Sequence, residues 1–429
     1  MKTDQIQKVH KDWYKLDLSA IVYPTLQRRD FSSVYRLSVL LKEDIDPEIL
    51  QRAVNLTMPR FPTYKAAIRK GVFWRYLEPN DRPGPFVQED VKNPCQPMHF
   101  KGNNRYLVRI YYYRNRIALE AHHSLGDGTG GMCVLQTLTA TYLRLKGHSE
   151  IENGGFVLDI LGIPDPGELE DAYMKYANAK VCPPRPGEKT YRVRGTKEPF
   201  YTLNIIDGIM SVSEVMQVAK SYNATITEYL NSVLLYALMQ KQESEWHLKL
   251  RPVKIAMPVN LRRFFPSRTL RNFITMIYPG IDPRLGEYTF EEIVTQVHNY
   301  MRYYLNEKLL RGDITTNAET QRNPFIRIVP LFIKDLVVRQ FYTKIQDKNS
   351  SAGLTNMGAL KVPETMKPYI ERFDIYMGQP FSTRTNCAIA SFEDILTINF
   401  ASSIAETDVE RLFFRKLVQD GIHVKIESN

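Results

Sequence analysis

Cysteine is scarce in this sequence, with 4 residues among 429. Cys95, Cys133, Cys182 and Cys387 are far apart and form no C-x-x-C pair. Zinc ribbons and redox motifs need closely spaced cysteines, and a small disulfide-bonded domain needs many of them. We therefore predict neither a metal site nor a disulfide framework.

Long apolar runs and internal repeats are also absent. No stretch approaches the ~18 apolar residues that cross a bilayer, and the polar residues 1–12 do not resemble a secretory leader. The lack of a repeat of roughly 20 to 50 residues argues against a solenoid. We predict a cytoplasmic protein without an integral membrane segment.

The positive charge is not concentrated in one region of the sequence. The net charge is +10, but the basic residues are scattered, and the one dense group is Arg262, Arg263, Arg268 and Arg271. Nucleic-acid binding proteins concentrate their charge on one face, so we predict no nucleic-acid partner. A phosphate-bearing cofactor or an acidic carrier protein would suit this arginine cluster better.

The remaining composition is that of an ordinary globular protein, with 43% hydrophobic and 24% charged residues. The length favours two lobes, and we expect a monomer, with a weak dimer as the alternative. Aromatic residues are in excess, with 25 Tyr and 20 Phe, which fits large aromatic cores or an apolar substrate tunnel.

Periodicity and capping signals predict alternating strands and helices. The expected strands cover about 35–41, 71–77, 106–113, 117–123, 201–206, 253–259, 273–281, 386–392 and 395–402. The expected helices cover about 47–56, 132–146 and 213–222, together with three that follow capping boxes at Thr225, Thr289 and Thr407.

Proline and glycine punctuate residues 151–199, which show little periodicity. We therefore expect this stretch to connect an N-terminal lobe, residues 1–150, to a C-terminal lobe, residues 200–429. The segment around 370–402 is a candidate for crossing back to the N-terminal lobe.

The most distinctive motif is His122-His123-Ser124-Leu125-Gly126-Asp127-Gly128. Histidine is mostly neutral yet protonatable near neutral pH, so it suits the removal of a proton from an alcohol, amine or thiol. Because side chains alternate along a strand, only one of the two histidines faces a given cleft.

Asp127 and the glycines after it form the second part of the motif. The Asp127 carboxylate could cap the following helix, orient an imidazole or pair with an arginine that braces the loop. We expect Gly128, Gly130 and Gly131 to allow positive φ and close approach of a substrate to the backbone.

Three other interpretations of the motif are weaker. Adjacent strand histidines diverge and are poor joint metal ligands, and no Glu or Cys follows at zincin-like spacing. A histidine pair buried for structural reasons would not need the whole motif. Ser124 lacks the G-x-S-x-G elbow of a serine nucleophile.

At these residues the chain resembles the chloramphenicol acetyltransferase-like superfamily of CoA-dependent acyltransferases, whose signature is H-H-x-x-x-D-G. Weaker similarities include 258–263 with 271–273, Leu354 to Gly358, and the D-x-x-x-G-x-P skeleton of 374–380. The segment 13–24 resembles the opening of alcohol acetyltransferase-type members. The resemblance implies an α/β (α+β) fold of two similar lobes, each a mixed sheet with helices, and an active-site tunnel between them.

By resemblance, His123 would be the general base, supported by His122, Asp127 and Gly128. Ser382, Thr383 and Asn386 are candidates for the group that stabilises the oxyanion, or for turn and strand polar groups that satisfy the backbone. Arg262, Arg263 and Arg271 would meet CoA phosphates, or form a solvated face with one member paired to Asp127.

The expected function is transfer of an acyl group from acyl-CoA to an alcohol or amine, through a tetrahedral intermediate and without an acyl-enzyme. Acyl-CoA would be a co-substrate, and no cofactor would be bound permanently. One alternative is a condensation-type enzyme that takes its acyl group from a phosphopantetheine thioester on an acyl carrier protein. Another is a non-catalytic binding module of the same fold.

Overall fold

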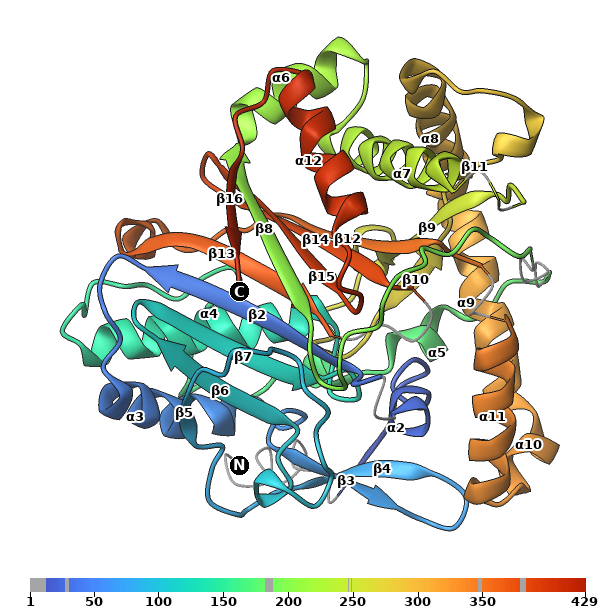
Figure 1. Cartoon of the computed structure of the whole chain (residues 1–429). Coiled ribbons are helices and arrows are strands. Elements are labelled where there is room, and N and C mark those ends of the chain that lie inside the picture. Colours follow the sequence, from blue (N-terminus) through green and yellow to red (C-terminus); the bar gives the residue numbers. More distant parts are fainter. Residues whose placement is uncertain are drawn as a thin grey trace.

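A five-stranded sheet forms the N-terminal lobe of this computed structural model, which describes residues 13–27, 31–181, 188–245, 247, 249–345, 349–378 and 383–429. The strand order is β13-β2-β7-β6-β5. Their bounds are Ile370–Met377, Val34–Leu41, Arg116–His122, Val108–Tyr113 and Val87–Glu89. Helices α3 (Pro47–Thr57) and α4 (Gly128–Leu145) pack together, with α4 also against β2 and β7 (Figure 1).

An eight-stranded sheet forms the C-terminal lobe, in the order β10-β9-β12-β14-β15-β8-β16, with β11 beside β9. The bounds along that order are Ile274–Ile277, Val253–Asn260, Ala352–Ala359, Thr385–Phe392, Ile395–Ser402, Asn204–Ser211, Lys425–Ser428 and, for β11, Gly280–Ile281. Its helices are α6 (Val212–Ser221), α7 (Ile226–Ser244), α8 (Phe290–Tyr304) and α12 (Asp408–Gln419).

The two lobes share strands and side chains. β13 comes from the C-terminal half of the chain but pairs with β2, whereas β14 and β15, which follow it, belong to the eight-stranded sheet. Along β14, Cys387 and Ile389 pack into the C-terminal core, and Ala388 and Ala390 pack into the N-terminal core. The period-2 alternation of one strand therefore serves both lobes.

A smaller sheet and several short elements lie beside the two lobes. The three-stranded sheet has the order β1-β4-β3, with bounds Tyr14–Lys15, Arg75–Pro79 and Ala66–Lys70. The remaining α-helices of the described chain are α2 (Tyr23–Leu26), α5 (Ala172–Tyr176), α9 (Glu307–Arg322), α10 (Pro324–Ile328) and α11 (Leu331–Ile345).

Local signals placed most of these elements correctly. The Thr225 and Thr289 capping boxes are formed, and Gly421 ends the last helix with a positive φ of 89°. The strand predicted at 71–77 begins too early, because residues 71–74 are the turn between β3 and β4 and the strand β4 starts at Arg75. The Thr407 capping box is wrong, because Thr407 makes no side-chain cap.

Two further differences concern helices. α4 begins at Gly128 and not near Met132, because Asp127 caps it by accepting hydrogen bonds from the amides of Thr129 and Gly130. The predicted helix pattern also stops before α9, α10 and α11. Those helices run down one side of the molecule, and α11 lies beside the β3–β4 turn (Figure 1).

Candidate active site

His122 is the last residue of β7, and both of its ring nitrogens have partners. Nδ1 accepts a hydrogen bond from the Ser124 amide at 3.2 Å, so the ring proton is assigned to Nε2, which lies 3.1 Å from Oε1 of Gln27. The ring is fully buried and meets Phe100 edge-on. With both nitrogens occupied, His122 has none left for a substrate.

His123 lies beyond the end of the strand, and its ring nitrogens are not used in the same way. The Tyr23 ring stacks on the imidazole at 4.7 Å between centroids, and the Tyr35 ring lies tilted against it at 4.6 Å. Nδ1 is buried without a hydrogen-bond partner, and the Asn272 side chain and the Gly126 backbone act on the ring to raise its pKa. The backbone is fixed, because its amide donates to Ser33 and its carbonyl accepts from Asn272 Nδ2, each at 2.9 Å.

Burial keeps both imidazoles neutral at neutral pH. It lowers the pKa of His122 to about 3, and the neighbouring His123 lowers it further. It lowers the pKa of His123 to about 4, although the negative charge of Asp127 acts in the opposite direction. A neutral imidazole with an unpaired nitrogen can accept a proton, which is the requirement for a general base.

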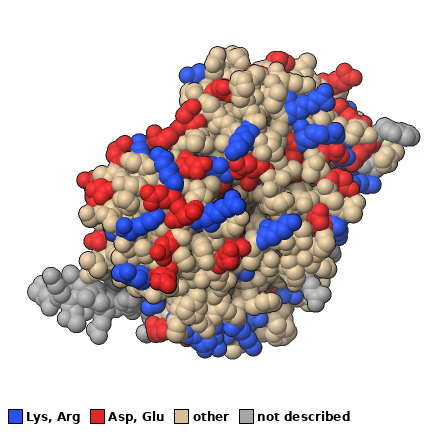
Figure 2. Space-filling view, turned by 60° about the vertical axis from the view of Figure 1, so that its left-hand side comes forward, with Lys and Arg blue, Asp and Glu red and all other residues tan. Residues whose placement is uncertain are grey.

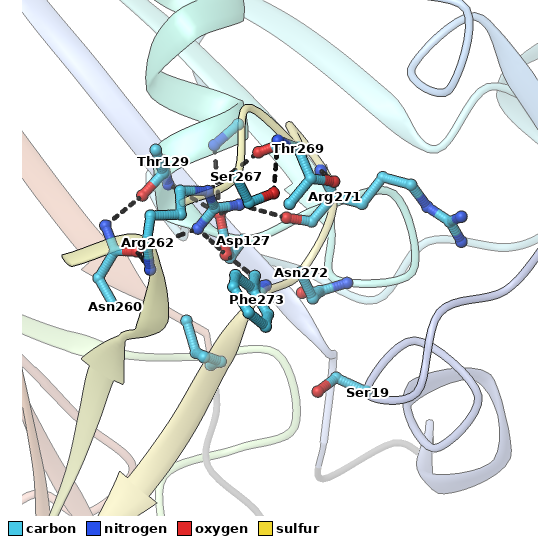
Figure 3. Close-up of polar contacts among 12 residues, drawn as sticks. Ser19, Asp127, Thr129, Asn260, Arg262, Ser267, Thr269, Arg271, Asn272 and Phe273 are labelled. Atoms are coloured by element: carbon cyan, nitrogen blue, oxygen red, sulfur yellow. Dashed lines mark hydrogen bonds and ion pairs between the residues drawn. The ribbon is translucent and has the colours of Figure 1, made fainter. Parts of the chain in front are cut away.

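Asp127 joins the motif to the C-terminal lobe (Figure 3). Its carboxylate accepts from both terminal nitrogens of Arg262, at 2.8 and 3.2 Å, and from the Phe273 amide at 2.9 Å, in addition to capping α4. Arg262 also donates to the backbone carbonyls of Thr269 and Arg271. The bidentate pair therefore ties the loop to the segment after β9.

The motif glycines allow tight packing within the protein and do not adopt positive φ, contrary to the prediction. Gly128, Gly130 and Gly131 all lie in the first turn of α4. A Cβ on Gly130 would lie 1.9 Å from the Leu270 carbonyl oxygen, and one on Gly131 would lie 2.6 Å from the Tyr35 hydroxyl. Their backbones meet protein atoms too closely for any side chain.

Arg271 points away from Asp127 (Figure 3) and belongs to a second buried cluster. Its guanidinium lies 3.6 Å from the Asp17 carboxylate and donates to the Lys15 carbonyl. Asp17 also accepts from the side chain of Asn272, the residue that holds the His123 carbonyl. Burial raises the pKa of Asp17, while the charge of Arg271 lowers it.

The predicted oxyanion donors, Ser382, Thr383 and Asn386, belong to the start of β14 or to the residues just before it. Ser382 lies outside the described residues. Thr383 is buried and donates to Asn386 Oδ1, which also accepts from the Gly353 amide. Among the described residues, the Asn386 Nδ2 amide nitrogen forms no hydrogen bond to a protein group, so it is the group available to a ligand.

The arginine cluster does not form one patch. Arg262 and Arg271 are committed to Asp127 and Asp17, and Arg268 pairs with Asp165 at the surface. Arg263 is exposed and has no ion-pair partner among the described residues. Over the face in Figure 2, basic and acidic side chains are intermingled, which agrees with scattered charge.

Sequence reasoning missed a basic cavity of about 320 Å³ in the C-terminal lobe. Five cationic residues line it: Arg192, Arg194, Lys249, Arg251 and Arg384. Of these, Arg194, Lys249, Arg251 and Arg384 form no ion pair with a described residue. They come from three separate segments, so they form no local cluster along the chain.

Sequence reasoning also missed the aromatic rings that enclose His123. Tyr23 lies in the short helix α2 and Tyr35 in β2, far from the motif along the chain.

Within the described residues, no group of three or more His, Cys, Asp and Glu side chains is arranged to hold a metal ion. No described helix has both the length and the apolar character of a membrane span.

Comparisons with known proteins gave matches in structure only. No protein family matches the sequence, and no curated protein does. TRI101 of F. sporotrichioides, solved with coenzyme A and T-2, has a TM-score of 0.63 and 13% identity, over 97% of this chain and 100% of that one. Polyketide synthase associated protein 5 from Mycobacterium tuberculosis has a TM-score of 0.58 and 13% identity, over 94% and 96%.

A third similar structure is the starter condensation domain of rhizomide synthetase, in a variant solved with C8-CoA and Leu-SNAC. Its TM-score is 0.59 at 10% identity, over 97% of this chain and 96% of that one. The expected fold is therefore confirmed: the chain has the two-lobed mixed α/β fold of these three solved structures.

Proposed function

We propose that this protein is an acyltransferase that moves an acyl group from acyl-CoA to an alcohol or amine, with His123 as the general base. The observation that carries the proposal is the contrast within the motif. His123 is neutral, lies against two tyrosine rings and has a ring nitrogen, Nδ1, without a hydrogen-bond partner, whereas His122 has partners at both nitrogens. The fold is compatible with this chemistry but does not identify it.

In the proposed reaction, the imidazole of His123 takes the proton from the acceptor hydroxyl or amine. The acceptor atom attacks the thioester carbonyl and forms a tetrahedral intermediate, with no acyl-enzyme. Collapse of the intermediate breaks the carbon–sulfur bond, and the imidazolium returns the proton to the departing thiolate. General base catalysis of this kind is worth about 10² to 10⁴ in rate.

Asp127 has a positioning role in this proposal. Its carboxylate is shared by Arg262, the Phe273 amide and the start of α4, so it fixes the loop that carries His123. Gly128 begins that helix, and His122 anchors the end of β7. For the developing oxyanion we retain Asn386, Thr383 and Ser382 as the proposed donors, with the Asn386 amine the most available of the described two.

We assign the phosphates of the donor to the basic cavity in place of Arg262 and Arg271, and exposed Arg263, which lies beside Gly358 at the other end of β12, is left outside that site. Several cations without ion-pair partners favour a phosphate ligand. Met357, near the end of β12, lies next to Gly128, whereas Arg384 lies just before the start of β14. Asn386, two residues after Arg384, pairs with Gly353 of β12. Gly353 lies four residues before Met357, so the cavity end and the motif end of β12 are roughly 13 Å apart along the strand. A long phosphopantetheine arm would span it.

The remaining parts of the proposal concern partners and place. We propose a cytoplasmic protein, a monomer with a weak dimer as the alternative, that acts on small acceptors without nucleic acid. A carrier-protein thioester is the second candidate donor, since it presents the same phosphopantetheine arm, and solved condensation domains have this fold.

The test is release of free thiol by the purified full chain, with acetyl-CoA, longer acyl-CoAs and an acylated carrier protein as donors. We expect release with a CoA donor and a suitable alcohol or amine, and a loss of about 10² to 10⁴ in His123→Ala. A His123→Ala variant as active as the wild type would refute the assignment of the base.

Two other outcomes decide between the alternatives. Release from the carrier donor alone would favour the condensation-type reaction. If no donor and acceptor pair gives turnover while CoA still raises the melting temperature, the protein is a binding module of this fold.

A further inference from the structure

Helix α11 presents apolar side chains to solvent and its one acidic side chain to the protein. Phe332, Leu336 and Val337 are exposed by 73%, 59% and 60%. Asp335, on the opposite side, forms an ion pair with Arg75 at 2.6 Å and accepts from the Thr25 hydroxyl at 2.8 Å. A surface helix of a globular protein normally has the reverse arrangement. The outer face of α11 therefore indicates contact with something apolar.

The β3–β4 turn and α10 lie beside α11 (Figure 1) and add further exposed apolar side chains to it. The Leu331 amide donates to the Val72 carbonyl, and Lys334 Nζ donates to the Phe73 carbonyl, both at 2.9 Å, so the β3–β4 turn lies against α11. We call the combined surface the apolar platform. Its exposed members are Val72, Phe73, Trp74, Phe325, Ile328, Phe332, Leu336 and Val337. Patches of this extent mark interaction sites.

The charges around the platform have one sign. Lys70 and Arg327 are exposed beside it, Lys334 lies between its two halves, and Arg339 follows on α11. Within 69–75 and 323–340, the one acidic residue is Asp335, which is paired with Arg75. A basic surface with Phe, Trp and aliphatic side chains is suited to an anionic lipid bilayer, whose interface attracts cations and accommodates aromatic rings.

We propose that the apolar platform docks this protein on the surface of anionic membranes, with its side chains in the interface and no segment across the bilayer. A second copy of the chain fits less well, because a symmetric dimer would bring Lys70, Arg327 and Lys334 against their own copies. The proposal is independent of the proposed reaction.

The platform is structurally connected to the candidate active site. Thr25 of α2 contacts Asp335, and its carbonyl accepts a hydrogen bond from Arg339 Nε at 2.9 Å. Two residues earlier on the same helix, Tyr23 stacks on the His123 ring. Docking at the platform would therefore place the lipid surface near the short helix that covers the base.

The test is sedimentation of the full-length protein with phosphatidylcholine vesicles, with or without phosphatidylglycerol. We expect sedimentation with the anionic vesicles, weakened at about 1 M salt, where the Debye length is roughly 3 Å. The Phe332→Glu/Leu336→Glu variant should bind the anionic vesicles at least about tenfold more weakly than the wild type, because charge replaces two anchoring side chains. Lys70→Ala/Arg327→Ala should lose the preference for anionic lipid.

The matched control is Leu161→Glu/Leu285→Glu, which changes two apolar residues exposed by 90% and 80% outside the platform. It should bind vesicles as the wild type does. Failure of the wild type to sediment, or equal binding by the platform variant with unchanged thermal unfolding, would overturn the proposal. A wild-type dimer that becomes a monomer in the platform variant, without vesicle binding, would also overturn it in favour of self-association. Thiol release with a water-soluble acceptor, measured without vesicles, reports separately on the proposed reaction.

Discussion

The residues that hold the histidine motif in place, which we call the frame, differ from the residues proposed to act on a ligand in whether their polar atoms have partners within the protein. The frame consists of His122, Asp127 and Arg262. His122 is hydrogen-bonded to a side chain and a backbone amide, and Arg262 is hydrogen-bonded to Asp127 and to a backbone carbonyl. By contrast, His123 Nδ1 is buried without a partner, and the side chains of Arg251 and Arg384 in the basic cavity form no ion pair with a described residue. Paired polar groups build the site, and unpaired ones are left to act on a ligand.

The largest expected effect comes from breaking the frame. Arg262→Ala would leave Asp127, whose side chain is 3% exposed, without its cation. We expect the free energy of unfolding to fall by about 3 to 5 kcal/mol, the usual effect of removing one partner of a buried ion pair. Chemical denaturation measures this change.

The control for that experiment is Arg268→Ala, which removes an ion pair on the surface, where the arginine side chain is 81% exposed. Its effect should be within about 1 kcal/mol. Equal losses in the two variants would mean that the Asp127–Arg262 pair does not hold the loop as described.

A smaller effect, on donor binding and not on stability, is expected from changes in the basic cavity. Arg251→Ala/Arg384→Ala should leave stability unchanged and raise KM for the CoA donor by about tenfold or more, because each charged hydrogen bond contributes about 1.5 to 3 kcal/mol. KM for the acceptor should stay constant. Initial rates at varied donor and acceptor concentrations separate the two constants, and an equal rise in both would argue against a phosphate site in the cavity.

The local features of the site could be predicted from the sequence, because they depend on neighbouring residues. The strand before His123 and the N-terminal cap formed by Asp127 follow from alternation and capping rules. A single dense arginine group, Arg262 to Arg271, drew attention to the segment that pairs with Asp127, but it also suggested a patch that the fold divides.

The features that could not be predicted depend on distant segments. Tyr23, Gln27 and Asn272 reach the motif from α2, the residue after α2 and the segment after β9, and no local pattern relates them to His123. The helices α9 to α11 escaped prediction for another reason. α11 has its apolar residues on the outside, so the rule that apolar residues face the core gives no sign of where it packs.

The pH dependence of kcat/KM tests the central claim that the base is the neutral His123, which two tyrosine rings enclose. The folded-state pKa of His123 is lowered to about 4, so its neutral form persists as pH falls through 6.5, the ordinary pKa of histidine, and is lost only near pH 4. We predict that kcat/KM for a water-soluble acceptor stays constant, within about twofold, from pH 8 to about pH 5. A decline centred near pH 6.5, in protein that circular dichroism shows to be folded, would contradict the account.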